Sequence, residues 1–372
     1  MPNPYHYGSP VTGDQFAGRH TEQRALTDRM RDGINVVVVS PRRYGKTSLL
    51  NRAAERVEGA GAVVVSVTAM GVADMASFAT QMLAQVYRAK GGKWHRTKQA
   101  VPEFLKRIRV TPTVTFDGDH PTFSLTPSMT PADLHSVVSD VYELLAELSE
   151  RKPAVLVVDE FQDVLGIGAH LPALFKSLAD RHPTVSLVVA GSKRHVMQQL
   201  VLDEAAPLYG MSTTLALSAI PAEEMSDFLV RRAIAGEKEL PVALADRIVE
   251  MAGPVPNDIQ YLAYEVYGTA GQTITARDVD TGMRLAVEHE SDFNAWRFDA
   301  LAAGQRRVLK QLADLPTAQP YSDDFRQAVH VRSPGSLRNA LNPLVEQDLV
   351  SPAGGTYRVT SPYFAAWLRA RP

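Results

Sequence analysis

A tight turn between a run of four valines and an amphipathic stretch constrains the fold of this chain more than any other feature. The valines, Val36 to Val39, have the pattern of a buried strand, and residues 48–57 have the pattern of a helix. The turn between them is Ser40-Pro41-Arg42-Arg43-Tyr44-Gly45-Lys46-Thr47. It matches the spacing GxxxxGK(S/T), except that Ser40 stands where the first glycine is expected.

The residues of this turn have the chemistry that a bound phosphate requires. Backbone N–H groups in the turn and at the helix N-terminus converge on one spot and attract an anion. Lys46 can reach the β- and γ-phosphates of a nucleotide, the Thr47 hydroxyl can ligate Mg²⁺, and Gly45 leaves room for the phosphate against the backbone. We therefore expect residues 40–48, up to Ser48, to bind nucleotide and Mg²⁺. The alternative is an ordinary strand–turn–helix junction with a chance Gly-Lys-Thr.

Two carboxylates follow a later apolar run. Residues 154–158 have the pattern of a buried strand, and Asp159 and Glu160 stand at its carboxyl end, which is where ligands bind in open parallel sheets. Asp159 would hold Mg²⁺ beside Thr47, and Glu160 would orient or deprotonate an attacking water. The alternative is a strand that ends in a solvated acidic turn. Because the phosphate loop lies upstream, we favour the metal-and-base interpretation.

Polar residues also follow the apolar run 185–190. They are Gly191, Ser192, Lys193 and Arg194, and they too are expected at the ligand edge of the sheet. Ser192 could sense the γ-phosphate, and Lys193 or Arg194 could contact a phosphate or a neighbouring subunit. In the alternative, Ser192 caps a helix and the two cations are solvated.

The order of strand and helix patterns predicts an α/β protein with a parallel sheet. Helical patterns separate successive apolar runs, as in βαβ units. The predicted strands are residues 34–39, 62–68, 154–158, 185–190 and 213–217. Residues 1–220 are therefore expected to form a P-loop NTPase core with a five-stranded parallel sheet of the RecA/AAA type, into which a hairpin at about residues 109–126 is inserted.

Helical patterns dominate the rest of the chain. Residues 221–295 contain four helical stretches. Two of them are separated by the segment Gly253-Pro254-Val255-Pro256-Asn257. We expect Asn257 to cap the helix that follows. A helical block after such a core could cover a nucleotide as a lid. Residues 296–372 contain three helices and a hairpin, which is the pattern of a winged-helix domain.

The first 18 residues are rich in proline, glycine and aromatic residues, and they predict an extended arm that belongs to the core domain. Its aromatic rings could pack against an adenine base, or the arm could cap an edge of the sheet. The residues by themselves favour the second alternative.

Two segments are candidates for nucleic-acid binding. Residues 296–372 hold ten lysines and arginines against six aspartates and glutamates, a net charge of +4, but the third predicted helix, residues 333–347, has only Arg338 as a cation. Residues 88–109 are basic, with Trp94 among the cations. Protein docking, packing on the core or a solvated helix face would explain the same patterns. DNA and a protein partner therefore both stay open.

The composition excludes several other classes of protein. The chain of 372 residues has a net charge of −2. Its overall charge therefore does not attract it electrostatically to nucleic acid or to a membrane surface. It contains no cysteine, so disulfides, thiolate metal sites and a cysteine nucleophile are excluded. No apolar stretch approaches the ~18 residues of a membrane helix, and no signal-peptide pattern opens the chain. We therefore expect a cytoplasmic protein without membrane contact.

With these segments assigned, the sequence resembles the archaeal-type ATP-binding proteins of the P-loop superfamily. These proteins belong to the AAA+/STAND-like branch and have a C-terminal winged helix. The resemblance covers nearly the whole chain. Six segments carry it: the box at residues 10–19, the phosphate loop with its two arginines at 40–50, the metal-and-base strand at 155–160, the sensor strand at 189–192, the GxP segment at 253–260 and the wing at 355–364.

The resemblance implies further nucleotide contacts. It places an FxGR segment, with Phe16, Gly18 and Arg19, by the adenine, and it places Pro254 of the lid near the nucleotide. The chain departs from the family pattern at the first position of the phosphate loop and has no clearly placed trans-acting arginine, for which Arg181 is a candidate by position. Assembly into a homo-oligomer therefore stays open.

Two functions are consistent with these features. In the first, the chain hydrolyses the β–γ bond of ATP with Mg²⁺, using Lys46, Glu160 and Ser192 as catalytic residues, and the cycle moves the lid and winged helix in a regulatory or remodelling role. In the second, it is a slow-turnover switch or scaffold that binds DNA or a partner protein through the winged helix. A metabolite kinase is disfavoured because no acceptor-substrate motif is visible.

Overall fold

The structure, a computed structural model, describes residues 2–91, 113–117, 120–124, 131–150, 152–192, 194–204, 206–210, 213–352 and 355–371. The described residues form two compact units. One unit runs from Arg19 to Ser218 and holds the predicted phosphate loop. The other combines the N-terminal arm, up to Gly18, with the chain from Ala219 onward.

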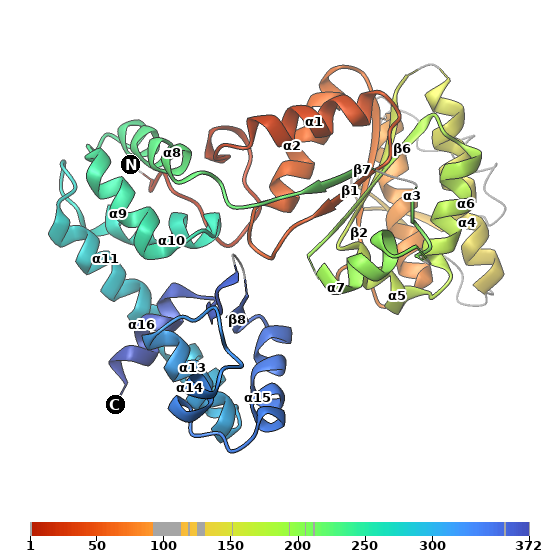
Figure 1. The fold of residues 1–372 in the computed structure, drawn as a ribbon. Helices are drawn as coiled ribbons and strands as arrows, with labels where there is room; N and C mark the ends of the chain where they lie inside the picture. Colours follow the sequence, from red (N-terminus) through yellow and green to blue (C-terminus); the bar gives the residue numbers. More distant parts are fainter. Residues whose placement is uncertain are drawn as a thin grey trace. The chain divides into compact units, whose positions relative to one another are not determined.

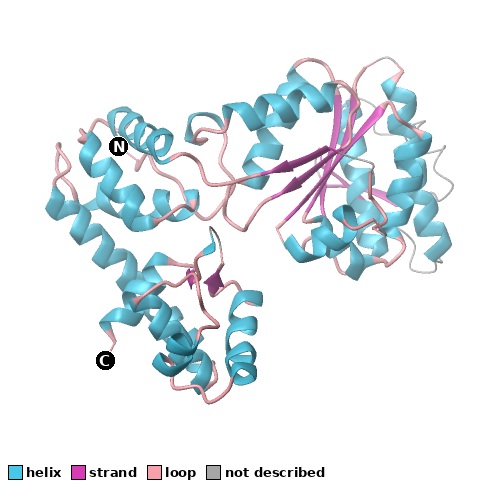
Figure 2. Cartoon of the chain, in the orientation of Figure 1, coloured by secondary structure: helices cyan, strands magenta, loops and turns pink. Residues whose placement is uncertain are grey.

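A five-stranded parallel sheet forms the centre of the Arg19–Ser218 unit (Figure 2). Its order is β2-β5-β6-β1-β7, and every neighbouring pair is parallel. The strands are β1 Val36–Val39, β2 Val63–Thr68, β5 Ala154–Asp159, β6 Val185–Gly191 and β7 Thr213–Ala216. All residues of β5 and β6 are buried, because both faces of a parallel sheet are covered. The predicted fold class and the five-stranded sheet are confirmed.

Helices cover both faces of this sheet, with α1 and α2 on one face and α3, α4 and α6 on the other (Figure 1). They are amphipathic: in α6, Leu171, Phe175 and Leu178 are fully buried at helical spacing. The helices of this unit are α1 His20–Arg31, α2 Lys46–Gly59, α3 Met75–Gly91, α4 Pro131–Ser149, α5 Val164–Ile167, α6 Leu171–Arg181 and α7 Arg194–Met197, with the short helical turns η3 Phe161–Asp163 and η4 Gln198–Leu202.

An antiparallel hairpin is inserted between α3 and α4. Its strands are β3 Thr113–Asp117 and β4 His120–Ser124, at the place where a hairpin was predicted for residues 109–126. Most of the basic segment 88–109 lies outside the described residues, so its contact with nucleic acid stays a prediction. Within the part of the chain that the structure describes, no helix combines the length and the apolar character needed to cross a membrane.

Four helices form a block in the other unit. They are α8 Ala222–Ala235, α9 Val242–Ala252, α10 Pro256–Thr269 and α11 Ala276–His289. Thr275 and Asp278 cap the start of α11 reciprocally, since each side chain bonds the other residue's backbone N–H. The expectation that Asn257 caps α10 is wrong, because the helix already begins at Pro256 and its cap residue is Val255. Proline is favoured at this first position because a helix offers no partner for the N–H that proline lacks.

The N-terminal arm is anchored on this helical block. The Tyr5 hydroxyl donates to the Leu229 carbonyl over 2.7 Å, and the Arg232 guanidinium donates to the Pro4 carbonyl over 2.7 and 3.0 Å. Tyr5 is 2 % exposed and lies in the apolar core of the block. The observed division therefore differs from the predicted core domain, which joined the arm to the sheet, because the arm's buried tyrosine packs among helices.

A winged-helix domain follows the block. Three serines begin its helices: the hydroxyls of Ser322, Ser333 and Ser361 each accept a hydrogen bond from a backbone N–H three residues further on. The elements after α11 are α12 Ser291–Asp299, α13 Ala303–Asp314, α14 Asp323–Ala328, α15 Pro334–Glu346, the antiparallel wing strands β8 Val350–Ser351 and β9 Arg358–Val359, and α16 Pro362–Ala370. The predicted three helices and wing are confirmed.

The last helix, α16, joins the winged helix to the helical block. Tyr363 lies in the core of the block, and its hydroxyl donates to the Asp258 carbonyl. Phe364, Trp367 and Leu368 lie in the core of the winged helix. One helix therefore contributes side chains to two cores, which explains why the block and the winged helix form a single compact unit.

Candidate nucleotide site

The phosphate loop joins β1 to α2 through two residues with left-handed backbone conformation. Arg43 has a φ of 66°, and Gly45, which directly precedes α2, has a φ of 84°. Glycine adopts this conformation without steric penalty because it has no Cβ. The turn makes Lys46 and Thr47 the first two residues of α2, at the positive end of a helix of 14 residues.

Ser40 fits the position at which the phosphate-loop pattern has glycine. It is fully buried, and its N–H donates to the Gly191 carbonyl over 3.3 Å. It is not among the residues with a positive φ. A serine is therefore accommodated without the strain that a left-handed conformation would bring.

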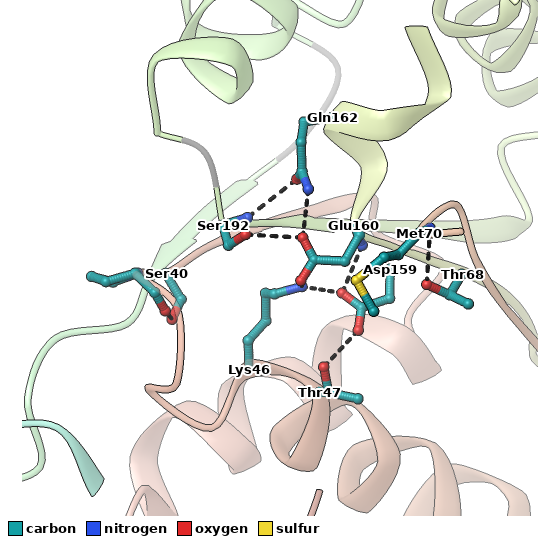
Figure 3. A network of polar contacts seen from close by, with 10 residues as sticks. Ser40, Lys46, Thr47, Thr68, Met70, Asp159, Glu160, Gln162 and Ser192 are labelled. Carbon is teal, nitrogen blue, oxygen red and sulfur yellow. Dashed lines mark hydrogen bonds and ion pairs between the residues drawn. The ribbon is translucent and has the colours of Figure 1, made fainter. Parts of the chain in front are cut away.

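Lys46 is ion-paired with both of the carboxylates that the sequence singled out (Figure 3). Its Nζ donates to Asp159 Oδ1 and, over 2.9 Å, to Glu160 Oε1. The Lys46 side chain is only 6 % exposed. A cation buried to this degree requires opposite charge beside it, which the carboxylates supply. The phosphate loop and the end of β5 thus form one polar site.

Thr47 and Asp159 form the candidate metal site. The Thr47 hydroxyl donates to Asp159 Oδ2 over 2.7 Å, so the two oxygen atoms that were predicted as ligands are adjacent. A hydroxyl and a carboxylate are the oxygen ligands that suit Mg²⁺, which takes few ligands from a protein and the rest from phosphate and water. The donor set of these residues therefore fits Mg²⁺.

Glu160 follows β5 in a left-handed conformation, with a φ of 51°. Its Oε1 accepts from Lys46, and its Oε2 accepts from Ser192 Oγ over 2.9 Å and from Gln162 Nε2. Burial by itself raises the pKa of Glu160, but the Lys46 charge and these hydrogen bonds outweigh it and hold the pKa below its ordinary value. Glu160 is therefore ionised at neutral pH, as a residue that accepts a proton from water must be.

Gln162 is a site residue that the sequence analysis missed. Its amide lies between Glu160 and Ser192 (Figure 3): Nε2 donates to the carboxylate, and Oε1 accepts from the Ser192 N–H over 3.2 Å. The residue is 5 % exposed and lies in η3. The signal that could have revealed it is a polar residue two positions after the proposed base, at the ligand edge of the sheet.

Arg19 contacts the backbone of the phosphate loop. Its Nη2 donates to the Tyr44 carbonyl over 2.9 Å and to the Ser218 carbonyl over 2.7 Å, and its Nη1 pairs with Glu22. The residue is 3 % exposed. These bonds tie the loop to the segment that follows β7, and the place by the adenine that the family resemblance implied stays a prediction.

The other predicted loop residues differ in exposure. Arg42 and Arg43 are exposed, and Pro41 is half-buried. Tyr44 and Ser48 are buried. The two arginines therefore lie at the exposed surface of the loop, and their contact with nucleotide stays a prediction.

Several predicted residues either belong to the other unit or are not described. Phe16, Gly18 and Pro254 belong to the other unit. Lys193 and the Arg194 side chain lie outside what the structure describes. Their contact with nucleotide stays a prediction.

Comparison with known proteins identifies the architecture. Residues 295–370 match the family described as a probable winged helix domain. No curated protein matches the chain. Among solved structures, the Walker-type ATPase PABY2304 of Pyrococcus abyssi has a TM-score of 0.68 and 15% identity, over 98% of this chain and 99% of that chain. The chain has the fold of a Walker-type ATPase.

Two further solved structures are similar to this chain in fold. The ORC2 protein of Aeropyrum pernix, solved as ADPNP–ADP complexes, has a TM-score of 0.59 and 13% identity, over 99% of this chain and 96% of that chain. The ORC1 protein of the same organism, solved in complex with DNA, has a TM-score of 0.50 and 14% identity, over 96% of this chain and 93% of that chain. The similarity confirms, at the level of the fold, the predicted resemblance to P-loop ATPases with a C-terminal winged helix.

Proposed function

We propose that the chain binds ATP with Mg²⁺ at the phosphate loop and hydrolyses the β–γ bond. One observation carries this proposal: Lys46 and Thr47, from the first turn of α2, contact Asp159 and Glu160, from the end of β5. Phosphoryl transfer needs a cation, a metal-ligating pair and a group that positions the attacking water in one place. The Walker-type fold supports the same assignment.

Each side chain has one role in this proposal. Lys46 exchanges its bonds to the two carboxylates for bonds to phosphate oxygens. Thr47 and Asp159 hold Mg²⁺, which neutralises charge on the phosphates when it is bound. Glu160 orients the attacking water and accepts its proton, and Ser192, whose hydroxyl bonds Glu160, senses the γ-phosphate.

Phosphate release from ATP tests this proposal. We expect the wild-type chain to release phosphate with Mg²⁺ and to stop when EDTA removes the metal. Asp159→Asn should lower Mg²⁺-dependent release by about 100-fold or more, since it removes the charged metal ligand. Asp180→Asn, on the exposed side of α6, is the matched control and should release phosphate at the wild-type rate. Wild-type release by Asp159→Asn would show that the metal assignment is wrong.

The contacts of Glu160 favour a second candidate function, an ATP-dependent switch with slow turnover. Both carboxylate oxygens are already bonded, one to Lys46 and the other to Gln162 and Ser192. Despite burial, the Lys46 charge and these hydrogen bonds hold the pKa of Glu160 below its ordinary value, which makes the carboxylate a weaker base toward water. A switch of this kind should turn over at a rate on the order of 10⁻³ s⁻¹, as unassisted switch NTPases do. Steady-state turnover near 1 s⁻¹, without a partner, would exclude it.

We further propose that the winged-helix domain binds duplex DNA. Its third helix, α15, exposes Arg338, Asn339 and Asn342, and the exposed Arg332 lies just before it. Arginine and asparagine are the side chains best suited to read guanine and adenine in the major groove. The charge of +4 over residues 296–372 favours a polyanion. The similar ORC1 structure is that of a DNA complex.

The remaining part of the proposal concerns a protein partner and self-association. Arg181 is exposed at the last turn of α6 and is the candidate to act on the nucleotide of a neighbouring copy. Capture of partners by the Glu160→Gln form with ATP, analysed for both protein and nucleic acid, identifies what the chain binds. The mass of the ATP-bound chain in solution gives its oligomeric state, and a monomer at all concentrations would exclude the role of Arg181.

A further inference from the structure

The amide of Gln162 connects the two strand ends that form the candidate site. Its Nε2 donates to Glu160 Oε2, just after β5, and its Oε1 accepts from the N–H of Ser192, the first residue after β6 (Figure 3). The residue is 5 % exposed, so both bonds are shielded from water. An amide offers a donor and an acceptor at once, which an apolar or acidic side chain does not.

The end of β6 is shaped to admit this amide. A Cβ at Gly191 would lie 2.5 Å from Gln162 Oε1 and 2.4 Å from Met197 Sδ, both well inside contact distance. Gly191 is not among the glycines with a positive φ, so the space around it, rather than its backbone conformation, requires glycine. The space that a side chain at Gly191 would fill is occupied by Gln162 and Met197, at the end of a strand that lies between β1 and β5.

We propose that Gln162 is a positioning residue that fixes the Glu160 carboxylate against the end of β6. The inference rests on the proposed hydrolysis of ATP, in which Glu160 orients the attacking water. With Oε2 held by Gln162 and Ser192, Oε1, which accepts from Lys46, is the oxygen that becomes available to the water when Lys46 binds phosphate. This orientation matters because a displacement of about 1 Å at a catalytic group can lower a rate by about 100-fold.

The variant Gln162→Met tests the inference, because methionine has a similar length but donates no hydrogen bond. We expect kcat for ATP to fall by about 10- to 100-fold. The dissociation constant for ATP should stay within about twofold of wild type, since the interaction acts on the base and not on the bound nucleotide. Gln199→Met, at an exposed position of η4, is the matched control and should keep the wild-type kcat.

Amide hydrogen exchange at Ser192 gives a readout that does not depend on turnover. Its N–H donates to Gln162 Oε1, so in Gln162→Met it should exchange about tenfold faster, as expected for the loss of one hydrogen bond. Gly191→Ala displaces the same amide by a different route, and because its Cβ also crowds Met197 Sδ, it should lower kcat at least as much. The double variant should lose little more than Gly191→Ala, because Gln162→Met removes an interaction that Gly191→Ala has already disrupted.

The results separate this inference from the proposed function on which it rests. If the wild-type chain releases no phosphate from ATP, the proposed function is wrong and the role of Gln162 fails with it. If the wild-type chain turns over and Gln162→Met keeps its kcat, only the role of Gln162 is wrong. A loss of kcat that is matched by a loss of ATP affinity, or by a lower unfolding midpoint than that of Gln199→Met, would show a structural role and would also overturn the inference.

Discussion

The Thr47 hydroxyl lies 2.7 Å from Asp159 Oδ2, although the two residues are 112 positions apart in the chain. The contact joins the first turn of α2, which follows β1, to the end of β5. These two strands are not neighbours, since β6 lies between them. Parallel strands bring their carboxyl ends to one edge of a sheet, so the residues that follow them meet there. The candidate site is therefore a direct consequence of the strand order.

Replacing Lys46 should abolish ATP binding. In Lys46→Ala the cation that would bind the phosphates is lost, and the adjacent carboxylates of Asp159 and Glu160 are left to repel the nucleotide's negative charge. We expect the affinity for a fluorescent ATP analogue to fall by about 100-fold or more, as is typical when a charged hydrogen bond is lost beside like charges. Lys176→Ala, on α6, is the control and should bind normally. Binding by Lys46→Ala within about threefold of wild type would exclude this role of Lys46.

Replacing Arg19 should destabilise the Arg19–Ser218 unit. Arg19→Ala leaves the carbonyls of Tyr44 and Ser218 without their charged donor, in a place where water has little access. We expect the free energy of unfolding to fall by about 2–4 kcal/mol, measured by urea denaturation. The exposed Arg24→Ala should change it by less than about 0.5 kcal/mol. Equal stability of the two variants would show that the Arg19 bonds contribute nothing to the fold.

The phosphate loop and the sheet could be predicted because each leaves a local pattern. The valine run before the loop and the carboxylates after the run 154–158 are read directly from neighbouring residues. Alternating strand and helix patterns then imply a parallel sheet, and its ligand edge brings Lys46 and Asp159 together. Ser40 departs from the pattern, yet its φ is not positive, so the serine adds no left-handed strain at that position.

The parts that could not be predicted depend on contacts between distant segments. The role of Gln162 is defined by the N–H of Ser192, and that of Arg19 by the carbonyl of Ser218, which lies 199 positions away. The position of Gln162 two residues after Glu160 could have marked it as a candidate, but no local spacing encodes the partners of either side chain. The same reason explains the N-terminal arm, because the packing of Tyr5 against the helical block could be known only from the fold.

The burial of Tyr5 predicts a loss of stability at alkaline pH. Burial raises the pKa of Tyr5 well above its ordinary value of 10.0, and the neighbouring Tyr267 raises it further. The charge of Arg232 lowers this pKa but does not outweigh the other two effects. The folded chain keeps the phenol neutral where the unfolded chain ionises it, so this contribution is fully present below about pH 10 and declines above it. Urea unfolding should therefore show a falling free energy of unfolding between about pH 10 and 11.

The variant Tyr5→Phe checks the assignment of this effect. It removes the hydrogen bond to the Leu229 carbonyl and should lower the free energy of unfolding by about 1 kcal/mol at neutral pH. It should also reduce the decline above about pH 10, because phenylalanine does not ionise. Tyr209→Phe, at an exposed position, is the control and should cost less than about 0.5 kcal/mol at neutral pH. An alkaline decline as steep in Tyr5→Phe as in the wild type would contradict the account.

The full chain should bind duplex DNA in a salt-dependent manner through α15. Arg338→Ala removes an exposed cation from that helix and should weaken binding by about 5- to 10-fold. Glu346→Gln removes an exposed negative charge from the same helix and should strengthen it. Fluorescence anisotropy with a labelled duplex over a range of salt concentrations measures both effects, and the slope counts the phosphates contacted. Absence of binding at low salt would exclude even a non-specific DNA role.

The central claim is that Glu160 is the group that activates water at a nucleotide site built by Lys46, Thr47 and Asp159. Glu160→Gln tests it most directly, because the amide keeps the shape of the carboxylate but cannot accept a proton. ATP affinity and the rate of phosphate release are measured on the same preparation. We predict ATP affinity within about threefold of wild type and phosphate release slower by about 100-fold or more. Phosphate release from Glu160→Gln at the wild-type rate would contradict the account.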